Sequence, residues 1–269
     1  MKIYPLLLLP ALFIAEQRGS ADNFSITHHS FSLQNGQWLR ACIHNIRRWQ
    51  WKNCGIFFAI ILVVTAGFAV LDFQGAVVSQ FQYFSQRPIQ IESLDNTILW
   101  LAQYLGYPLH FVYSFGSINS DNSPLSSAVG SLSTTCLALG YLYIIWLQWR
   151  KRINLAQSFI ALLMLFIATG KVFSPQYLLW LIPLLAYTEA FDGIWALLWG
   201  SLSMITMILF IFYYSHLPSG QGNIQGLIES LHGFFELLAA RNILFALLTL
   251  SYIFNWFQIR QRKSRPTVI

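Results

Sequence analysis

The sequence predicts an all-α polytopic membrane protein with about seven transmembrane helices and one outer interfacial helix. Hydrophobic residues make up 56% of the 269 residues, and charged residues only 10%. Soluble domains carry about 25% charged residues, so this chain cannot cover a water-facing surface. Long apolar runs also recur between clusters of basic residues. We therefore expect residues 1–269 to form a single membrane-embedded helical bundle.

The apolar runs define the predicted spans. A full span needs about 20 residues, with a range of about 17–25, and the first run is shorter than this and contains two prolines. The stretch 96–115 (NTILWLAQYLGYPLHFVYSF) is amphipathic and aromatic, and Gly106 and Pro108 interrupt it. We expect it to lie along the outer interface without crossing. The predicted spans are about 3–15, 54–71, 128–149, 154–170, 172–188, 194–214 and 236–257.

Three basic clusters orient the bundle. They lie at 40–52, 150–152 and 260–265, and the positive-inside rule places all three in the cytoplasm. Residues 16–53 then form a cytoplasmic connector with a basic, amphipathic stretch that touches anionic lipid. Residues 72–127, 171–176 and 215–235 fall outside.

An odd number of spans places the amino terminus outside. One explanation is a signal peptide, with Lys2 before a short apolar region. The other is that the chain begins in the middle of a larger protein, and we favour this second interpretation because the basic residues after the first run would otherwise have to be translocated.

Metal and disulfide frameworks are not predicted. Cys42, Cys54 and Cys136 are scattered without a C-x-x-C pair. The six histidines show no metal-ligand spacing, and His28-His29 is interpreted as a polar-loop pair. We expect no cofactor, although a divalent cation stays open as an alternative, and no nucleic-acid partner.

The turn GKVFSPQYLLW, residues 170–180, combines one cation with a helix start. Pro175 suits the first helical position, with Ser174 as the expected N-cap. The unpaired N–H groups and the positive dipole end of that helix then lie beside Lys171, and together they can hold an anion. The alternative is an ordinary interfacial turn. Gln176 and Tyr177 add further hydrogen-bond donors.

Two other cations lie away from the cytoplasmic clusters. Arg87 precedes a short polar segment, and Arg241 lies inside the last apolar run. An arginine inside a span usually faces a partner or a polar cavity. Arg241 is therefore a candidate phosphate ligand, or else it pairs with Glu236 or extends toward the outer headgroups.

Acidic residues accompany Arg87 in the predicted outer segment. Each is a candidate base, metal ligand or acceptor for a sugar hydroxyl. The alternative is a solvated loop with an Arg–Glu pair. The candidates are Asp72, Glu92 and Asp95.

These motifs carry a family resemblance. "KVFSPQYLLWLIPLLA", "SQRPIQIESL", the late "RN" at Arg241 and the opening "KIYPLLLLPALFIA" resemble bacterial polyprenol-phosphate-mannose-dependent mannosyltransferases, which are multi-spanning enzymes of the C-type glycosyltransferase fold. The resemblance covers the chain apart from 16–53, and K-V-F-S-P-Q-Y is its most specific part.

The resemblance implies a membrane hexosyltransferase in the bacterial plasma (inner) membrane. Its donor is a sugar on polyprenyl phosphate at the extracytoplasmic face. An acceptor hydroxyl attacks the anomeric carbon with inversion, and polyprenyl phosphate leaves. The resemblance assigns the donor phosphate to the cations and donors named above: Lys171, Arg87, Arg241, Ser174, Gln176 and Tyr177.

The resemblance also implies a missing part, because the family's catalytic acid lies before the region that matches Met1. The chain thus looks like a carboxy-terminal half, with a separately encoded amino-terminal half as a possible partner besides membrane lipid. A second hypothesis is a non-catalytic membrane module, either a lipid-carrier transporter or a subunit that completes the other half.

Overall fold

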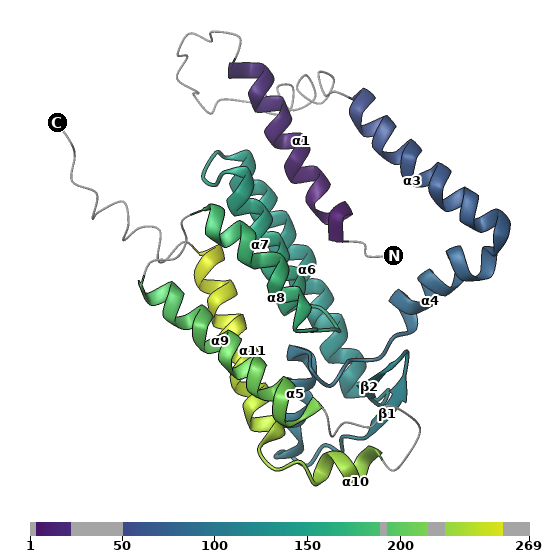
Figure 1. Ribbon diagram of the computed structural model, residues 1–269, viewed down its shortest axis with the longest axis vertical. Helices are drawn as coiled ribbons and strands as arrows, with labels where there is room; N and C mark the ends of the chain where they lie inside the picture. The colour runs from purple at the N-terminus through teal and green to yellow at the C-terminus, as the bar shows by residue number, and fades with distance from the viewer. Residues whose placement is uncertain (1–3, 23–50, 189–192, 215–223, 255–269) are drawn as a thin grey trace. The chain divides into compact units, whose positions relative to one another are not determined.

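The computed structural model describes residues 4–22, 51–188, 193–214 and 224–254, and it is mostly helical, at 76% (Figure 1). It divides into two compact units, Met1–Gln86 and Arg87–Ile269. The single bundle over residues 1–269 that the sequence predicts would have to include both units, and it stays a prediction. Every predicted apolar run contains a helix: α1 (Tyr4–Asp22), α3 (Trp51–Leu71), α6 (Pro124–Trp149), α7 (Leu155–Ala168), α8 (Gln176–Tyr187), α9 (Gly193–Phe212) and α11 (Phe234–Ile253).

In the first unit, α3 is apolar on all sides. Ile60, Leu62 and Val63 are each more than half exposed, which is the pattern of a helix surrounded by lipid. The chain continues through a π-helical turn, η1 (Gln74–Val78), into α4 (Ser79–Gln86). Helix α1 runs past residue 16, where the predicted connector begins, and residues 23–50 of that connector lie outside the described part.

In the second unit, five antiparallel helices form a bundle in which α7 packs against α6, α8 and α11, and α9 against α11. Among the described residues, α6, α9 and α11 are long and apolar enough to cross a membrane. Helices α7 and α8 have 14 and 12 residues, or about 21 and 18 Å, against a hydrocarbon core of about 30 Å. These features indicate a membrane protein, and the count of seven spans stays a prediction.

Local signals explain where the bundle helices begin. The hydroxyl of Ser123 caps α6, with Pro124 next and Ser126 completing a capping box. Asn154 and Gln157 do the same for α7. Helix α7 is buried almost throughout, from Ile160 to Leu165 without a break, as expected for a helix that is apolar on all sides and lies at the centre of the bundle.

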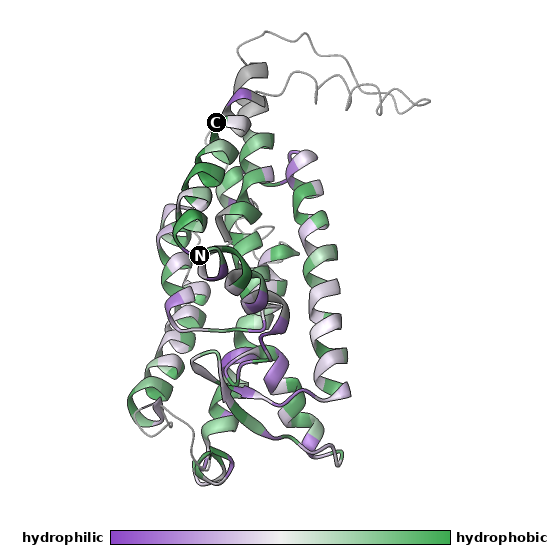
Figure 2. Ribbon diagram, turned by 90° about the vertical axis from the view of Figure 1, so that its right-hand side faces the viewer, coloured by the Kyte–Doolittle hydropathy of each residue, from purple (hydrophilic) through white to green (hydrophobic). Residues whose placement is uncertain are grey.

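A small cap that mixes polar and apolar residues covers one end of this bundle, where purple, white and green alternate in Figure 2. It consists of α5 (Leu94–Gln103), an antiparallel hairpin of β1 (Phe111–Ser114) and β2 (Ser117–Ser120), and α10 (Ile224–Glu229). The hairpin corrects the all-α prediction. A core that includes Ile91, Phe111 and Leu238 joins the cap to the bundle.

The stretch 96–115 is divided between a helix and a strand because of Gly106. With φ at +87°, Gly106 closes α5 in a Schellman arrangement, in which Tyr107 N–H donates to Ala102 O (3.2 Å) and Gly106 N–H to Gln103 O (2.9 Å). Pro108 then prevents the helix from resuming. Phe115 and Gly116, at φ +53° and +72°, form the two-residue loop of the hairpin.

Helix α5 is too short to span, at 10 residues or about 15 Å. Its inward face buries Asp95, Asn96 and Leu99, whereas Ile98 and Leu101 on the other face are exposed. An exposed apolar face agrees with the predicted interfacial position, which stays a prediction.

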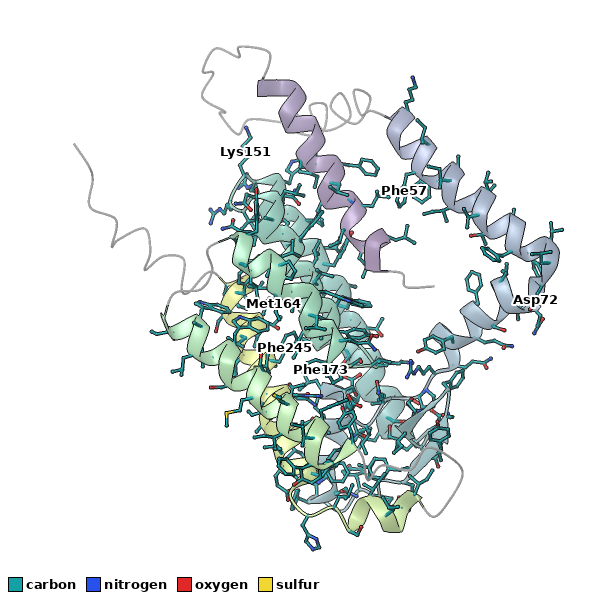
Figure 3. All side chains as sticks on the ribbon, viewed as in Figure 1. Phe57, Asp72, Lys151, Met164, Phe173 and Phe245 are labelled. Carbon is teal, nitrogen blue, oxygen red and sulfur yellow. The ribbon has the colours of Figure 1, made fainter. Side chains whose placement is uncertain are left out.

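The orientation of the second unit is testable at the two ends of α6. In the bundle, the cap lies at the end opposite the turn that carries Lys151 (Figure 3). With the native cysteines replaced, we expect Asn122→Cys to react with a membrane-impermeant maleimide in intact cells. Arg152→Cys should react only after permeabilisation. Labelling of both positions in intact cells would contradict a membrane-spanning α6.

Candidate functional site

The segment from Arg87 to Asp95 lies across the capped end of the bundle. Its main chain bonds to β2 on one side, because Ser120 N–H donates to Ile89 O (2.8 Å) and Ile91 N–H donates to Ile118 O (3.1 Å). On the other side, Gln90 N–H donates to Lys171 O (2.9 Å). The segment therefore connects the hairpin to the turn between α7 and α8.

Arg241 and Asn242 on α11 hold this segment from inside. Both are buried, at 0% and 1% exposure. Arg241 Nη2 donates to Glu92 O (2.6 Å) and to Asn242 Oδ1 (3.0 Å). Asn242 Nδ2 donates to Glu92 O (3.1 Å), Ser93 O (3.0 Å) and Thr97 Oγ1 (2.8 Å).

The charge of Arg241 is neutralised inside the protein. Its Nη1 lies 4.0 Å from Glu92 Oε2, and its guanidinium lies 4.3 Å from the centre of the Phe173 ring. Glu236 is exposed, so the predicted pair is wrong, and so is extension toward the headgroups. The physical reason is that Glu92 offers both a carbonyl and a carboxylate in a dry environment.

Glu92 lies between two arginines. Burial raises the pKa of its carboxyl, and the positive charges of Arg241 and Arg87 oppose that rise. Arg87 is itself 7% exposed and donates from Nη2 to Ser117 Oγ (3.0 Å). Burial lowers the pKa of Arg87, and nearby Tyr177 and Glu92 raise it.

Lys171 is the half-buried cation of the site. Its Nζ donates weakly to Arg87 O, at 3.4 Å. Its stem lies along α6, where a Cβ added at Gly130 would be 3.7 Å from Lys171 Cε. The ammonium group is thus held beside Arg87 and remains partly accessible.

Asp95 has one oxygen occupied and one without a partner. It is 1% exposed, and the hydroxyl of Ser133 on α6 donates to its Oδ1. Within the described part of the chain, Oδ2 has no hydrogen-bond partner. Burial raises the pKa of Asp95 to about 6, and Ser133 and the positive charge of Lys171 oppose that rise.

The start of α8 differs from the prediction. Pro175 occupies the N-cap position, and no side chain caps the helix, so Ser174 is not the cap. Tyr177 N–H donates to Ser174 O (2.9 Å) and Leu178 N–H to Pro175 O (3.1 Å). This tight first turn uses N–H groups that were expected to face an anion. Gln176 is exposed.

Tertiary packing brings together most of the predicted residues. Arg87, Glu92 and Tyr177 interact electrostatically, Arg241 joins them at Glu92, and Lys171 acts on Asp95. Asp72 belongs to the first unit, where it is exposed and accepts the N–H of Gly75 (3.0 Å).

Sequence reasoning missed Asn242, Ser117 and Ser133. The "RN" pair, Arg241-Asn242, offered a signal for the first, because an amide beside an intramembrane arginine can share its acceptor. Nothing in the sequence distinguished Ser117 or Ser133 from other serines, and α6 holds several besides Ser133.

The cluster carries three cations and two carboxylates, Arg87, Lys171 and Arg241 against Glu92 and Asp95, an excess of one positive charge when both acids are ionised. Such a site can hold one anion. The described residues contain no group of three or more His, Cys, Asp or Glu side chains suited to a metal ion. Comparisons with family models, curated proteins and solved structures found no match.

Proposed function

We propose that this chain binds a polyprenyl-phosphate-linked sugar at the extracytoplasmic face of the bacterial plasma membrane and takes part in hexosyl transfer from it. The observation that supports this proposal is the excess positive charge of the cluster, at the bundle end opposite the basic turn Arg150–Arg152. A phosphodiester donor carries one negative charge, which matches that excess.

The cations take different roles in this proposal. Lys171 is half-buried and adjacent to Arg87, so its ammonium makes the first contact with the donor phosphate, and Arg87 and the Tyr177 side chain complete the site. Arg241 is fully enclosed by Glu92, Asn242 and Phe173. Its role is to position the segment around Glu92.

The reaction that fits this arrangement is displacement at the anomeric carbon. An acceptor hydroxyl forms the new C–O bond, the bond from the anomeric carbon to the phosphate oxygen breaks, and polyprenyl phosphate leaves with the electron pair. Negative charge grows on the phosphate during this step. Preorganised cations stabilise that charge more in the transition state than in the bound donor.

Replacing Lys171 tests the proposal. A charge-assisted contact contributes about 1.5–3 kcal/mol, so Lys171→Met should weaken binding of a polyprenyl-phosphate sugar about tenfold to a hundredfold. Lys171→Arg should keep part of the affinity. Lys151→Met, at the opposite end of α6, is the matched control and should leave binding unchanged. The measurement is donor titration of purified variants at equal expression, read as bound donor and as sugar transfer.

Two results argue against the proposal. Unaltered donor dependence in Lys171→Met would make the lysine an interfacial anchor. Donor binding that depends on Lys171 without sugar transfer would instead favour a non-catalytic membrane module.

A further inference from the structure

We infer that Asp95 and Ser133 form a proton-accepting pair for the hydroxyl that attacks the donor. This inference rests on the proposed function, and it concerns the acceptor side of the reaction rather than the phosphate side. It assigns Ser133 the contact with the acceptor hydroxyl and Asp95 the final position of the proton.

Access distinguishes the two members of the pair. Asp95 is buried, at 1% exposure, and no substrate reaches it directly in this conformation. Ser133 is half-buried on α6 and bonds to Asp95 Oδ1 through its hydroxyl. When Ser133 Oγ accepts a proton, its own hydroxyl proton can therefore pass directly to the carboxylate of Asp95.

The spacing on α6 places this pair beside the phosphate site. Gly130, which lies next to the stem of Lys171, precedes Ser133 by three residues. Residues three apart on a helix lie on the same face, about 5–6 Å apart between Cβ atoms. A phosphate held by Lys171 and a hydroxyl at Ser133 would thus be neighbours, as a direct displacement requires.

The other candidate acids fit this role less well. The carboxylate of Glu92 faces Arg241 and Arg87, and its carbonyl accepts from both Arg241 and Asn242. Glu92 therefore has a structural role, because it attaches its segment to α11. Asp72 lies in the first unit and accepts the N–H of Gly75. Asp95 is the acid whose carboxylate accepts from Ser133 on α6, the helix that lies beside the stem of Lys171, whereas the hydroxyl of Tyr214 interacts with Glu92.

The proton balance closes without another reactant. The acceptor oxygen bonds to the anomeric carbon while its proton moves to Ser133 Oγ and the Ser133 proton moves to Asp95 Oδ1. The phosphate leaves with the electrons of the broken C–O bond. Asp95 then returns the proton to water. Lys171 is the charged group that acts on Asp95, whereas Arg241 on α11 faces Glu92.

The test separates binding from turnover in the full chain. In Asp95→Asn we expect turnover to fall about a hundredfold or more, with the Kd for a polyprenyl-phosphate sugar equal to or lower than that of the wild type. The wild-type rate should rise with pH through a step near 6, and this step should disappear in the variant. Ser133→Ala should lose turnover as well, and Ser133→Thr should restore part of it.

Ser131→Ala is the matched control, because this exposed hydroxyl on α6 bonds only within its own helix, to Ser127 O (2.8 Å). Normal turnover with the pH step intact in Asp95→Asn would overturn the inference and leave the proposed donor site standing. A wild-type chain that neither binds donor nor transfers sugar contradicts both.

Discussion

Replacing Arg241 by methionine should destabilise the protein by about 3–5 kcal/mol, the cost of removing one partner of a buried ion pair. The substitution leaves the carbonyl and carboxylate of Glu92 without the guanidinium that now contacts both. It also removes the cation–π contact with Phe173, at 4.3 Å. Because Arg241 joins α11 to a segment 149 residues earlier, we expect the cap to loosen from the bundle.

Three further variants sharpen this prediction. Arg241→Lys keeps the charge but loses the planar donor geometry, and should fall between the wild type and Arg241→Met. The double variant Arg241→Met with Glu92→Gln removes both charges and should recover part of the stability. Glu236→Ala, exposed on the same helix, should change stability by at most about 0.5 kcal/mol.

The measurement is unfolding of detergent-solubilised protein by denaturant titration. If Arg241→Met unfolds at the same midpoint as Glu236→Ala, then the guanidinium does not hold the cap in place.

Asp95→Asn should stabilise the protein at neutral pH by about 1–3 kcal/mol. The pKa of Asp95 is raised from 3.8 to about 6 by burial, and each unit of such a rise corresponds to about 1.4 kcal/mol of penalty on the ionised form. Asparagine keeps an oxygen to accept from Ser133 and carries no charge. A gain in stability paired with a loss of turnover is the pattern of a functional residue.

The sign of the pH dependence follows from the direction of this shift. Between pH 3.8 and about 6, the folded protein holds a proton at Asp95 that the unfolded chain has released, so stability falls as pH rises through that window. The gain from Asp95→Asn should therefore be full at pH 7.5 and be mostly lost near pH 4. Asp121→Asn, at an exposed acid directly after β2, is the control. An equal effect at both pH values would contradict the burial of an ionised Asp95.

The membrane class and the positions of the helices could be predicted from the amino-acid sequence. Hydropathy is a local property, and an apolar run must satisfy its backbone internally in lipid, so each run became a helix. The end of the helix near residue 106 could also be predicted, because Gly106 and Pro108 determine the backbone conformation locally. The hairpin that followed was not predicted, since its turn depends on positive φ at Phe115 as well as at Gly116.

Which side chains meet depends on how the helices pack, and the sequence did not predict it. Arg241 could have paired with Glu236, five residues earlier on the same helix, or with any acid at that end of the bundle. In the folded protein it meets Glu92, 149 residues earlier in the sequence. The same packing placed Ser133 against Asp95 and Lys171 beside Arg87. Local propensity carries no information about such distant contacts. They form because burying a charge or a carbonyl requires a partner, and the fold determines which partner is within reach.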